Sequence, residues 1–217
     1  MIPINDLGYM PYFEALQQQR CAHEKVVSDP SQACILIVQH PAVITLGKNA
    51  KTTNILIDRI QAREKGIDVV QTDRGGDVTM HMPGQLVIYP IIPLADFGLG
   101  LRQYITLLEN AVIEMLSGFD LVANCDPQYP GIWLGPNKVC ALGVRVNRRV
   151  SLHGLALNVN NDLSLFECIR PCGILERGVT SMAKELKVAV DMSDIQARLV
   201  RILQQNLYTR PKSCGFS

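Results

Sequence analysis

Three apolar segments in the second half of the chain, joined by very short links, constrain the fold most strongly. They cover residues 131–134, 139–146 and 151–160, and the links are Gly135-Pro136-Asn137 and Asn147-Arg148-Arg149. Links of about three residues join antiparallel neighbours, because a parallel crossover needs about a dozen residues. The sequence therefore predicts an antiparallel meander of three strands.

Apolar residues at helical spacing mark further elements on both sides of this meander. Helices are expected at 11–27, 101–116 and 193–207, the second ending at Gly118 and the third capped by Ser193. Shorter strands are expected at 33–38, 43–46, 69–70 and 121–124, and a short helix at 59–65 closed by Gly66. This order favours one α+β (α/β) domain over residues 1–217, with a mixed or antiparallel sheet and packed helices.

The composition excludes several classes of protein. Apolar residues make up 47% of the 217 residues and charged residues 19%, which is typical of a globular chain. A net charge of +1 argues against nucleic acid as the main partner. The longest apolar run, 86–95, is interrupted by Pro90 and Pro93 and is too short to span a bilayer, and we expect no signal peptide.

The seven cysteines indicate a reducing compartment. They are odd in number and scattered, and no two of them form a CxxC pair, so neither a zinc site nor a disulfide scaffold is expected. We therefore predict a cytoplasmic protein in which most thiols fill the core.

Residues 72–90, TDRGGDVTMHMPGQLVIYP, predict one wall of a binding pocket. Gly75 and Gly76 allow backbone torsions closed to other residues and a close approach of a ligand. A strand at 78–81, a turn on Pro83-Gly84 and a strand at 86–90 are expected to form a hairpin. The glycine pair lacks the flanking residues of a phosphate-binding loop, so these residues alone do not name the ligand.

Cys172, in the sequence Arg170-Pro171-Cys172-Gly173, is a candidate nucleophile. A free thiol has a pKa of about 8.5 and needs a nearby cation to ionise at neutral pH, and Arg170 and Lys138 are the candidates. The alternative is an inert, buried thiol, which is the more common case.

Histidines and arginines elsewhere in the chain have two interpretations. His40, His81 and His153 lack metal-ligand spacing and are read first as hydrogen-bonded structural residues, His40 at a strand end. The arginines 145, 148 and 149 form either a solvated hairpin tip or a docking patch for an acidic partner.

Four motifs follow one another along the chain. They are RGGDVTMHMPGQLVIYPI at 74–91, KVCALGVRV at 138–146, SLHGLALNVNNDLSLF at 151–166 and RPCG at 170–173. Together they resemble the lipoyl(octanoyl) transferase family, also called lipoate-protein ligase B, and the resemblance extends back to HPAVITLGKN at 40–49. It implies a fold similar to the catalytic domain of biotin and lipoate protein ligases, over about residues 30–210.

The resemblance implies an acyltransferase in the first step of endogenous protein lipoylation. Such an enzyme moves an octanoyl group from octanoyl-acyl carrier protein to a lysine of lipoyl domains in 2-oxoacid dehydrogenase complexes or of glycine-cleavage H protein. Cys172 would carry the group as a thioester, and Lys138 would lower the thiol pKa and serve as acid and base. The substrate-binding residues would be Arg74, Gly75, Gly76, Asp77, Val78, Thr79, Met80, His81, Ala141, Leu142, Gly143, Gly154, Leu155 and Ala156.

We expect no cofactor, no metal, no nucleic-acid or membrane partner, and a monomer. Two positions depart from the family pattern: Met82 stands where glycine is usual and could narrow the pocket mouth or change the flexibility of the loop, and Arg170 stands where asparagine is frequent. An ATP-dependent lipoate or biotin ligase and a non-catalytic acyl-binding protein are the competing interpretations. The acyl chain length, the acceptor and any share of His81 in proton transfer stay open.

Overall fold

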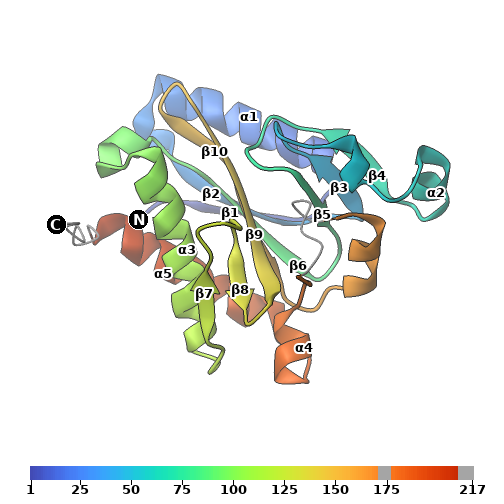
Figure 1. The fold of residues 1–217 in the computed structure, drawn as a ribbon. Helices are drawn as coiled ribbons and strands as arrows, with labels where there is room; N and C mark the ends of the chain where they lie inside the picture. The colour runs from blue at the N-terminus through green and yellow to red at the C-terminus, as the bar shows by residue number, and fades with distance from the viewer. Residues whose placement is uncertain (171–176, 210–217) are drawn as a thin grey trace.

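The computed structural model describes residues 1–170 and 177–209. It contains a seven-stranded sheet in the order β1-β2-β6-β10-β9-β8-β7 and a three-stranded sheet in the order β4-β3-β5 (Figure 1). The strands are β1 Ile4–Tyr9, β2 Cys34–Gln39, β3 Val43–Leu46, β4 Asp68–Gln71, β5 Val78–His81, β6 Gln85–Ile91, β7 Ala123–Cys125, β8 Ile132–Leu134, β9 Asn137–Asn147 and β10 Val150–Asn158.

Helices cover both faces of the larger sheet. The α-helices are α1 Tyr12–Ser28, α2 Arg59–Glu64, α3 Leu101–Ser117, α4 Met182–Leu186 and α5 Met192–Tyr208. The 3-10 helices are η1 Pro30–Gln32, η2 Thr52–Asn54, η3 Leu94–Phe97 and η4 Leu163–Cys168. Within the described ranges, no helix combines the length and the apolar character needed to cross a bilayer.

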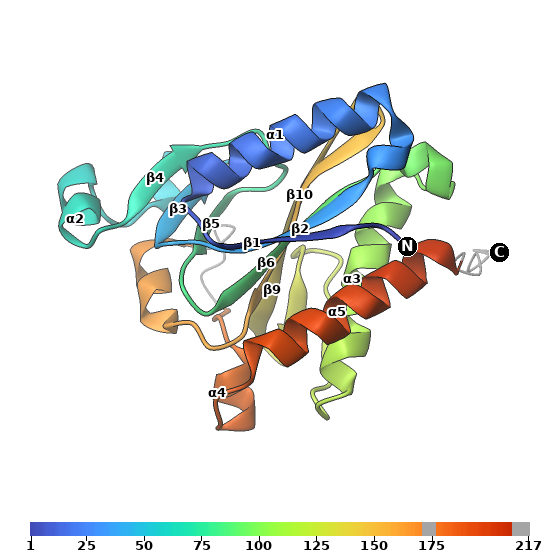
Figure 2. The same ribbon diagram turned by 180° about the vertical axis from the view of Figure 1, so that it is seen from behind.

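Strand β6 lies at the centre of the large sheet, and each face of it is buried by a different layer. Leu86 and Ile88 pack into the core beneath α3 and α5, which lie side by side in Figure 2. Val87 and Tyr89 point the other way, into the core beneath α1. Successive side chains of a strand alternate between faces, so a strand covered on both sides reads as a continuous apolar run.

The predicted meander is confirmed. Strands β8, β9 and β10 pair antiparallel in succession, and Asn147 faces Val150 across the tip of the β9–β10 hairpin. Arg148 and Arg149 have φ of 48° and 65°, as a two-residue hairpin loop with two left-handed positions requires. Because β1 pairs parallel with β2, the sheet is mixed, as expected for this fold class.

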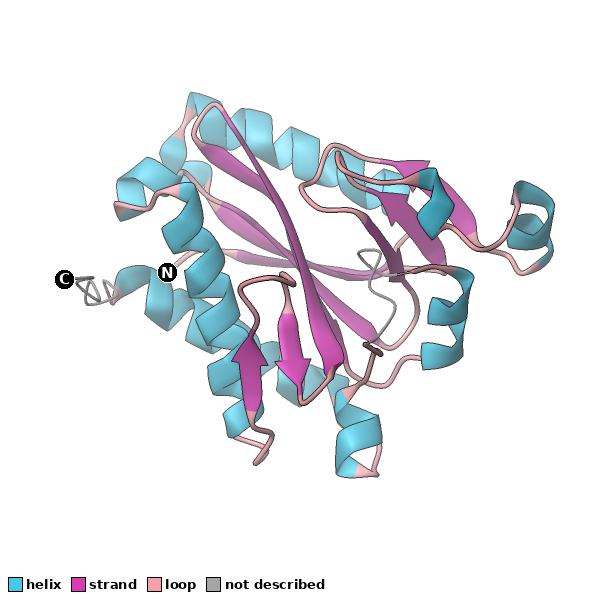
Figure 3. Ribbon diagram, in the orientation of Figure 1, coloured by secondary structure: helices cyan, strands magenta, loops and turns pink. Residues whose placement is uncertain are grey.

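The predicted hairpin of residues 78–90 is wrong, although both strands exist. Strand β5 pairs with β3 in the small sheet, whereas β6 pairs with β2 and β10 in the large one (Figure 3). A strand has only two edges, and both edges of β6 are occupied. The turn at Pro83-Gly84, with Gly84 at φ 83°, therefore carries the chain from one sheet to the other.

Two further details differ from the sequence-based predictions. The N-cap of α5 is Asp191, whose carboxylate accepts from the backbone N–H of Ser193 at 2.9 Å, and not Ser193 itself. Strand β1 was not predicted, because its sequence INDLGY has no alternating apolar pattern and most of its residues are exposed at the sheet edge.

Candidate active site

A cavity of about 270 Å³ lies between the two sheets. Strands β9 and β10 form one wall, and the loop before β5 together with β5 forms the facing wall. The volume is near the lower end of the roughly 300–1,000 Å³ found for small-molecule sites. These residues, all expected from the sequence, line the cavity: Arg74, Gly76, Asp77, Val78, Thr79, His81, Lys138, Ala141, Leu142, Gly143, Gly154, Leu155 and Ala156.

Two other expected site residues lie outside this lining. Met80 is fully buried in the core of the small sheet. Gly75 packs against β9, where its N–H donates to the Val144 carbonyl at 3.0 Å. Among residues 1–170 and 177–209, no three histidine, cysteine, aspartate or glutamate side chains are grouped so that they could hold a metal ion.

Arg74 organises the glycine loop from within. Its side chain is 6% exposed, and the guanidinium donates to the Thr45 carbonyl at 2.6 Å, to the Asp77 carbonyl at 2.7 Å and to the Gly75 carbonyl at 3.0 Å. One buried cation thus holds both ends of the loop and joins them to β3. Charge-assisted hydrogen bonds of this kind are stronger than neutral ones.

The glycine of β9 lets this loop lie directly on the strand. A methyl group on Gly143 would be 3.0 Å from the Gly75 carbonyl oxygen and 3.2 Å from Arg74 Cδ. Glycine at this position therefore brings two backbones together. Because Gly143 also lines the cavity, its missing side chain explains both the close packing of the loop on β9 and the closeness of the two cavity walls at this point.

Lys138, near the start of β9, is a buried cation that lines the cavity. It is 5% exposed, and its ammonium donates to the Pro130 carbonyl at 2.8 Å and lies 4.8 Å from the centre of the Trp133 ring. The backbone at Gly131 leaves room for it, because a methyl group there would be 3.0 Å from Lys138 Cε. The aromatic face and the carbonyl both stabilise the positive charge.

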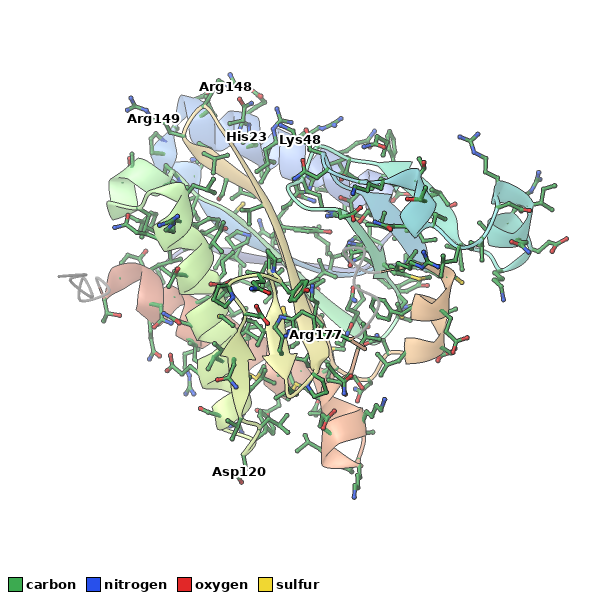
Figure 4. All side chains as sticks on the ribbon, viewed as in Figure 1. His23, Lys48, Asp120, Arg148, Arg149 and Arg177 are labelled. Atoms are coloured by element: carbon green, nitrogen blue, oxygen red, sulfur yellow. The ribbon has the colours of Figure 1, made fainter. Side chains whose placement is uncertain are left out.

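Arg177 shares the aromatic ring that lies beside Lys138. Its guanidinium lies 4.9 Å from the Trp133 ring and 4.7 Å from the Tyr129 ring, and it donates to Asp126 at 2.6 Å. In Figure 4, Arg177 lies near the start of β9, at the end of the hairpin opposite Arg148 and Arg149.

On each side of segment 171–176, hydrogen bonds connect the chain to a residue of the cavity lining, to Asp77 through Asn54 on one side and to Lys138 on the other. On the entering side, the Arg170 N–H donates to the Asn54 carbonyl at 2.7 Å, and the Asn54 amide donates to the Asp77 carboxylate at 2.6 Å. On the leaving side, Lys138 N–H donates to the Gly178 carbonyl at 2.9 Å. Cys172, the expected nucleophile, lies outside the described residues.

His81 is hydrogen-bonded as its structural interpretation requires. The Gln85 amide N–H groups donate to Met80 and Asn158, so Gln85 Oε1 accepts from His81 Nδ1 at 2.8 Å. Complete burial, reinforced by the neighbouring His40, holds the pKa of His81 well below its usual value. The imidazole is therefore neutral at pH 7.

His40 and His153 are likewise neutral. Burial lowers the pKa of His40 to about 4 and that of His153 to about 3, with Arg74 and Arg145 contributing to the second. His40 follows the end of β2, as predicted, and contacts Met10 and Tyr89. His153 Nε2 lies 2.7 Å from Asp73 Oδ1.

The model of the lipoyl protein ligase A/B catalytic domain matches residues 11–204. The chain belongs to this family. An octanoyltransferase of Bacteroides fragilis is 41% identical over 215 residues, covering 94% of this chain and 97% of the relative. An octanoyltransferase of Chloroflexus aggregans is 40% identical over 213 residues, covering 97% and 96%.

Solved structures agree on the fold. A lipoate-protein ligase A bound with ATP superposes with a TM-score of 0.74 at 17% identity, covering 94% of this chain and 84% of that one. A biotin protein ligase of Aquifex aeolicus gives a TM-score of 0.54 at 13% identity, covering 95% and 69%. The family and the ligase-like fold predicted from the motifs are thus confirmed.

The two departures from the family pattern have different surroundings. Met82 is buried in the small-sheet core and does not line the cavity, so the expectation that it narrows the pocket mouth is wrong. Its sulfur accepts from the Asn161 amide at 3.4 Å. The Arg170 side chain is exposed, and the bond that this residue donates to Asn54 comes from its backbone.

The three arginines near the β9–β10 tip are distributed between two places. Arg148 and Arg149 occupy the tip, as predicted, and Arg148 pairs with Glu24 of α1 (Figure 4). Arg145 faces Asp73 beside the glycine loop and pairs with it. Two of the three charges therefore already have an acidic partner within the chain.

Sequence reasoning missed several side chains that line the cavity in this family member. Tyr12 comes from α1, Phe166 from η4, and Gln85 and Asn158 from neighbouring central strands. Gln85 and Asn158 stood within the quoted motifs and could have been found as polar residues in otherwise apolar strands. For Tyr12, more than sixty residues before the glycine loop, the sequence carries no such signal.

Proposed function

We propose that this cavity holds an octanoyl chain, that Cys172 carries the chain as a thioester, and that Lys138 moves the protons. The enzyme is an acyltransferase of protein lipoylation, as its relatives named octanoyltransferase at about 40% identity support. One observation carries the assignment of the site. Lys138, whose ammonium is buried, lines an acyl-sized cavity, and its backbone N–H donates to the carbonyl of Gly178, six residues from Cys172.

The reaction needs two transfers at one sulfur. In the first, the Cys172 thiolate attacks the thioester carbonyl of octanoyl-acyl carrier protein, and the carrier thiolate leaves with a proton from Lys138. In the second, the amine of a lipoyl-domain lysine attacks the enzyme thioester, loses a proton to Lys138 and releases the Cys172 thiolate. A thioester donor is already activated, so no ATP is required.

The cavity walls suit an eight-carbon chain. Leu142 and Leu155 line it, whereas Val144, which lies on the same strand as Leu142, is not part of the lining. Burial of the chain contributes about 0.8 kcal/mol per methylene. The Gly75 N–H is already bonded to the Val144 carbonyl, so another donor must stabilise the oxyanion that forms in each transfer.

The test is intact mass spectrometry after mixing the protein with octanoyl-acyl carrier protein. We expect a hydroxylamine-labile adduct of one octanoyl group that Cys172→Ala abolishes and that Lys138→Ala forms far more slowly. Cys125→Ser, at an exposed thiol, is the matched control and should leave the adduct unchanged. An adduct that persists in Cys172→Ala would contradict the assignment.

Two other functions make different predictions in simple assays. The first alternative is a ligase, as in the solved structure bound with ATP. A ligase would attach free octanoate in an ATP-dependent reaction and would not need Cys172. A non-catalytic binding protein would bind the acylated carrier and form no covalent adduct. Transfer from the thioester without ATP separates our proposal from both.

The partners and setting complete the proposal. The donor is acyl carrier protein, the acceptors are lipoyl domains, and we expect the enzyme to act as a monomer in the cytoplasm. Arg148 and Arg149 would attract an acidic donor. Charge reversal at both should raise the donor KM at low salt, and an unchanged KM would refute this docking role.

A further inference from the structure

The side chain of Lys138 is held at both its charged end and its stem. Its ammonium donates to the Pro130 carbonyl at 2.8 Å and lies 4.8 Å from the centre of the Trp133 ring. Along the stem, the backbone at Gly131 is so close that a methyl group there would be 3.0 Å from Lys138 Cε and 3.2 Å from Cδ. Residues 130–133, around the start of β8, therefore help to fix where the ammonium lies.

A lysine needs such contacts if it is to move protons at a fixed point. Its four-carbon stem is flexible, and the contacts must offset the entropy that is lost when the stem is ordered. Tryptophan attracts a cation to its face more strongly than the other aromatic residues, and the attraction grows when water is excluded. Trp133 and Lys138 are 3% and 5% exposed, so their contact is of the buried, stronger kind.

The Trp133 ring is itself held in one orientation. Its indole N–H donates to the Tyr129 carbonyl at 2.9 Å, and the two rings lie 6.4 Å apart at an angle of 65°. The Arg177 guanidinium lies 4.9 Å from the Trp133 ring and 4.7 Å from the Tyr129 ring. A tilted aromatic neighbour, a hydrogen bond and a cation together leave the indole little freedom to rotate.

Asp126 holds Arg177 against these rings. Arg177 Nη1 donates to Asp126 Oδ2 at 2.6 Å, and the other carboxylate oxygen accepts from the Gln128 N–H at 2.8 Å. A planar guanidinium can stack on a ring and bind a carboxylate at the same time. Because Arg177 lies 51 residues after Asp126, the ion pair connects the aromatic stretch before β8 with the chain that pairs with Lys138.

We propose that Trp133 and Arg177 are positioning residues for the transfer reaction. Trp133 holds the Lys138 ammonium where it gives and takes protons, and Arg177 acts through Trp133 by fixing the orientation of its ring. The proposal rests on the proton-transfer role proposed above for Lys138 and adds the residues that support this role. Neither side chain takes part in the bonds that form or break.

The first test weakens the face of one ring without changing its size. Trp133 is the single tryptophan of the chain, so fluorinated tryptophans alter one site. Each fluorine on the six-membered ring withdraws negative charge from its face. As fluorines are added, we expect kcat for octanoyl transfer to fall stepwise, by about tenfold in all, with the donor KM and the Tm unchanged. A constant kcat across the series would overturn the proposal.

The second test compares two arginines with similar surroundings. Arg177→Met should lower kcat about fivefold, and Arg177→Lys, which keeps a cation without the planar fork, should have a smaller effect. Arg198→Met is the matched control: its guanidinium lies 5.1 Å from the Phe119 ring and pairs with Asp194, but it belongs to α5 and does not line the cavity. It should leave kcat unchanged, and an equal loss in the two methionine variants would contradict the proposal.

The same variant shows whether Arg177 acts through the ring. In the most heavily fluorinated protein, Arg177→Met should lower kcat by less than in the unmodified protein, because the hold that it supports is already weakened. Independent, multiplicative effects would mean that Arg177 acts by another route and would overturn its role.

A third measurement detects the contact without any reaction. In protein that carries 5-fluorotryptophan, Lys138→Met should shift the single fluorine NMR resonance, and Lys65→Met, at an exposed lysine after α2, should not. A resonance that stays in place in Lys138→Met would overturn the proposal whether or not an adduct forms. Normal transfer with a constant kcat on fluorination would refute only this proposal, whereas an adduct that persists in Cys172→Ala would refute the mechanism proposed above.

Discussion

Glycine is required at position 154 by the packing of a neighbouring strand more than by a ligand. A methyl group there would lie 2.1 Å from the Ile88 carbonyl oxygen and 3.0 Å from Pro90 Cδ, both on β6. The close approach coincides with His153, whose φ is 58° and whose N–H donates to the Gln19 side chain at 2.9 Å. A residue chosen from the sequence as a substrate contact is thus also a packing requirement.

We expect Gly154→Ala to destabilise the fold, since β6 and β10 would have to separate at the centre of the sheet. The expected loss is on the order of 3 kcal/mol in the free energy of unfolding, measured by urea denaturation. Gly100→Ala, where the nearest atom to the new methyl is a flexible Gln103 oxygen at 3.5 Å, should cost no more than about 1 kcal/mol. Equal stability of the two variants would contradict this account.

The residues that the sequence could identify are those whose type is unusual for their place. Lys138 opens an apolar strand, and the glycine pair precedes another, so both were found as candidates. Their surroundings were not predictable, because Pro130 and Trp133 meet Lys138 only after β8 and β9 pair. The role of Arg74 as the support of the loop depends in the same way on the position of β3.

At the scale of elements, η2 supports the segment that leads to Cys172. Asn54, at the end of η2, is 7% exposed and bonds both the Asp77 side chain and the Arg170 backbone. It therefore connects the glycine loop with the chain that enters segment 171–176. Neither connection is local in sequence, so the residues around Asn54 do not predict either of them.

We expect Asn54→Ala to slow formation of the octanoyl adduct by about tenfold. The variant loses the hydrogen bond to the Asp77 carboxylate, and with it the connection that positions the chain leading into segment 171–176. Thr53→Ala, an exposed neighbour in the same 3-10 helix, should have no effect. Rapid-quench mass spectrometry measures both rates. If Asn54→Ala acylates at the wild-type rate, η2 does not position the segment.

Element prediction succeeded where one pattern was strong and failed where two sheets compete for strands. The meander and the three long helices followed from apolar periodicity and short links. Strand β5 was assigned to the wrong neighbour, since Pro83-Gly84 serves equally well in a hairpin and in a crossing between sheets. The cap of α5 was placed two residues too late, because Asp191 and Ser193 are both good capping residues.

For the whole molecule, three neutral histidines at the junction of α1, the two sheets and the cavity make stability depend on pH. The pKa of His40 is about 4 and that of His153 about 3 in the folded protein, and His81 is shifted in the same direction, all chiefly by burial. Their pKa in the unfolded chain is about 6.5. The unfolded state therefore binds more protons below pH 6.5.

The free energy of unfolding should accordingly be constant above about pH 6.5 and fall as the pH decreases toward 5, with a limiting slope of about 1.4 kcal/mol per pH unit for each histidine. Urea denaturation at pH 7, 6 and 5 measures the slope. His40→Gln should make it shallower by the share of one histidine. A flat profile in the wild-type protein would mean that these imidazoles are protonated in the fold.

The last long helix secures the first strand. Gln204 of α5 donates to the Ile2 carbonyl at 2.7 Å, and Gln196 donates to the Asp6 carboxylate at 3.0 Å. The partners in these two bonds are 202 and 190 residues apart in the sequence. Strand β6 likewise lacks its second neighbour, β10, until the later part of the chain has been synthesised. Strand β1 can therefore pair with β2 early, but it gains its contacts with α5 only when synthesis is nearly finished, and until β10 is made one edge of β6 is left unpaired, where unfinished chains can associate with one another.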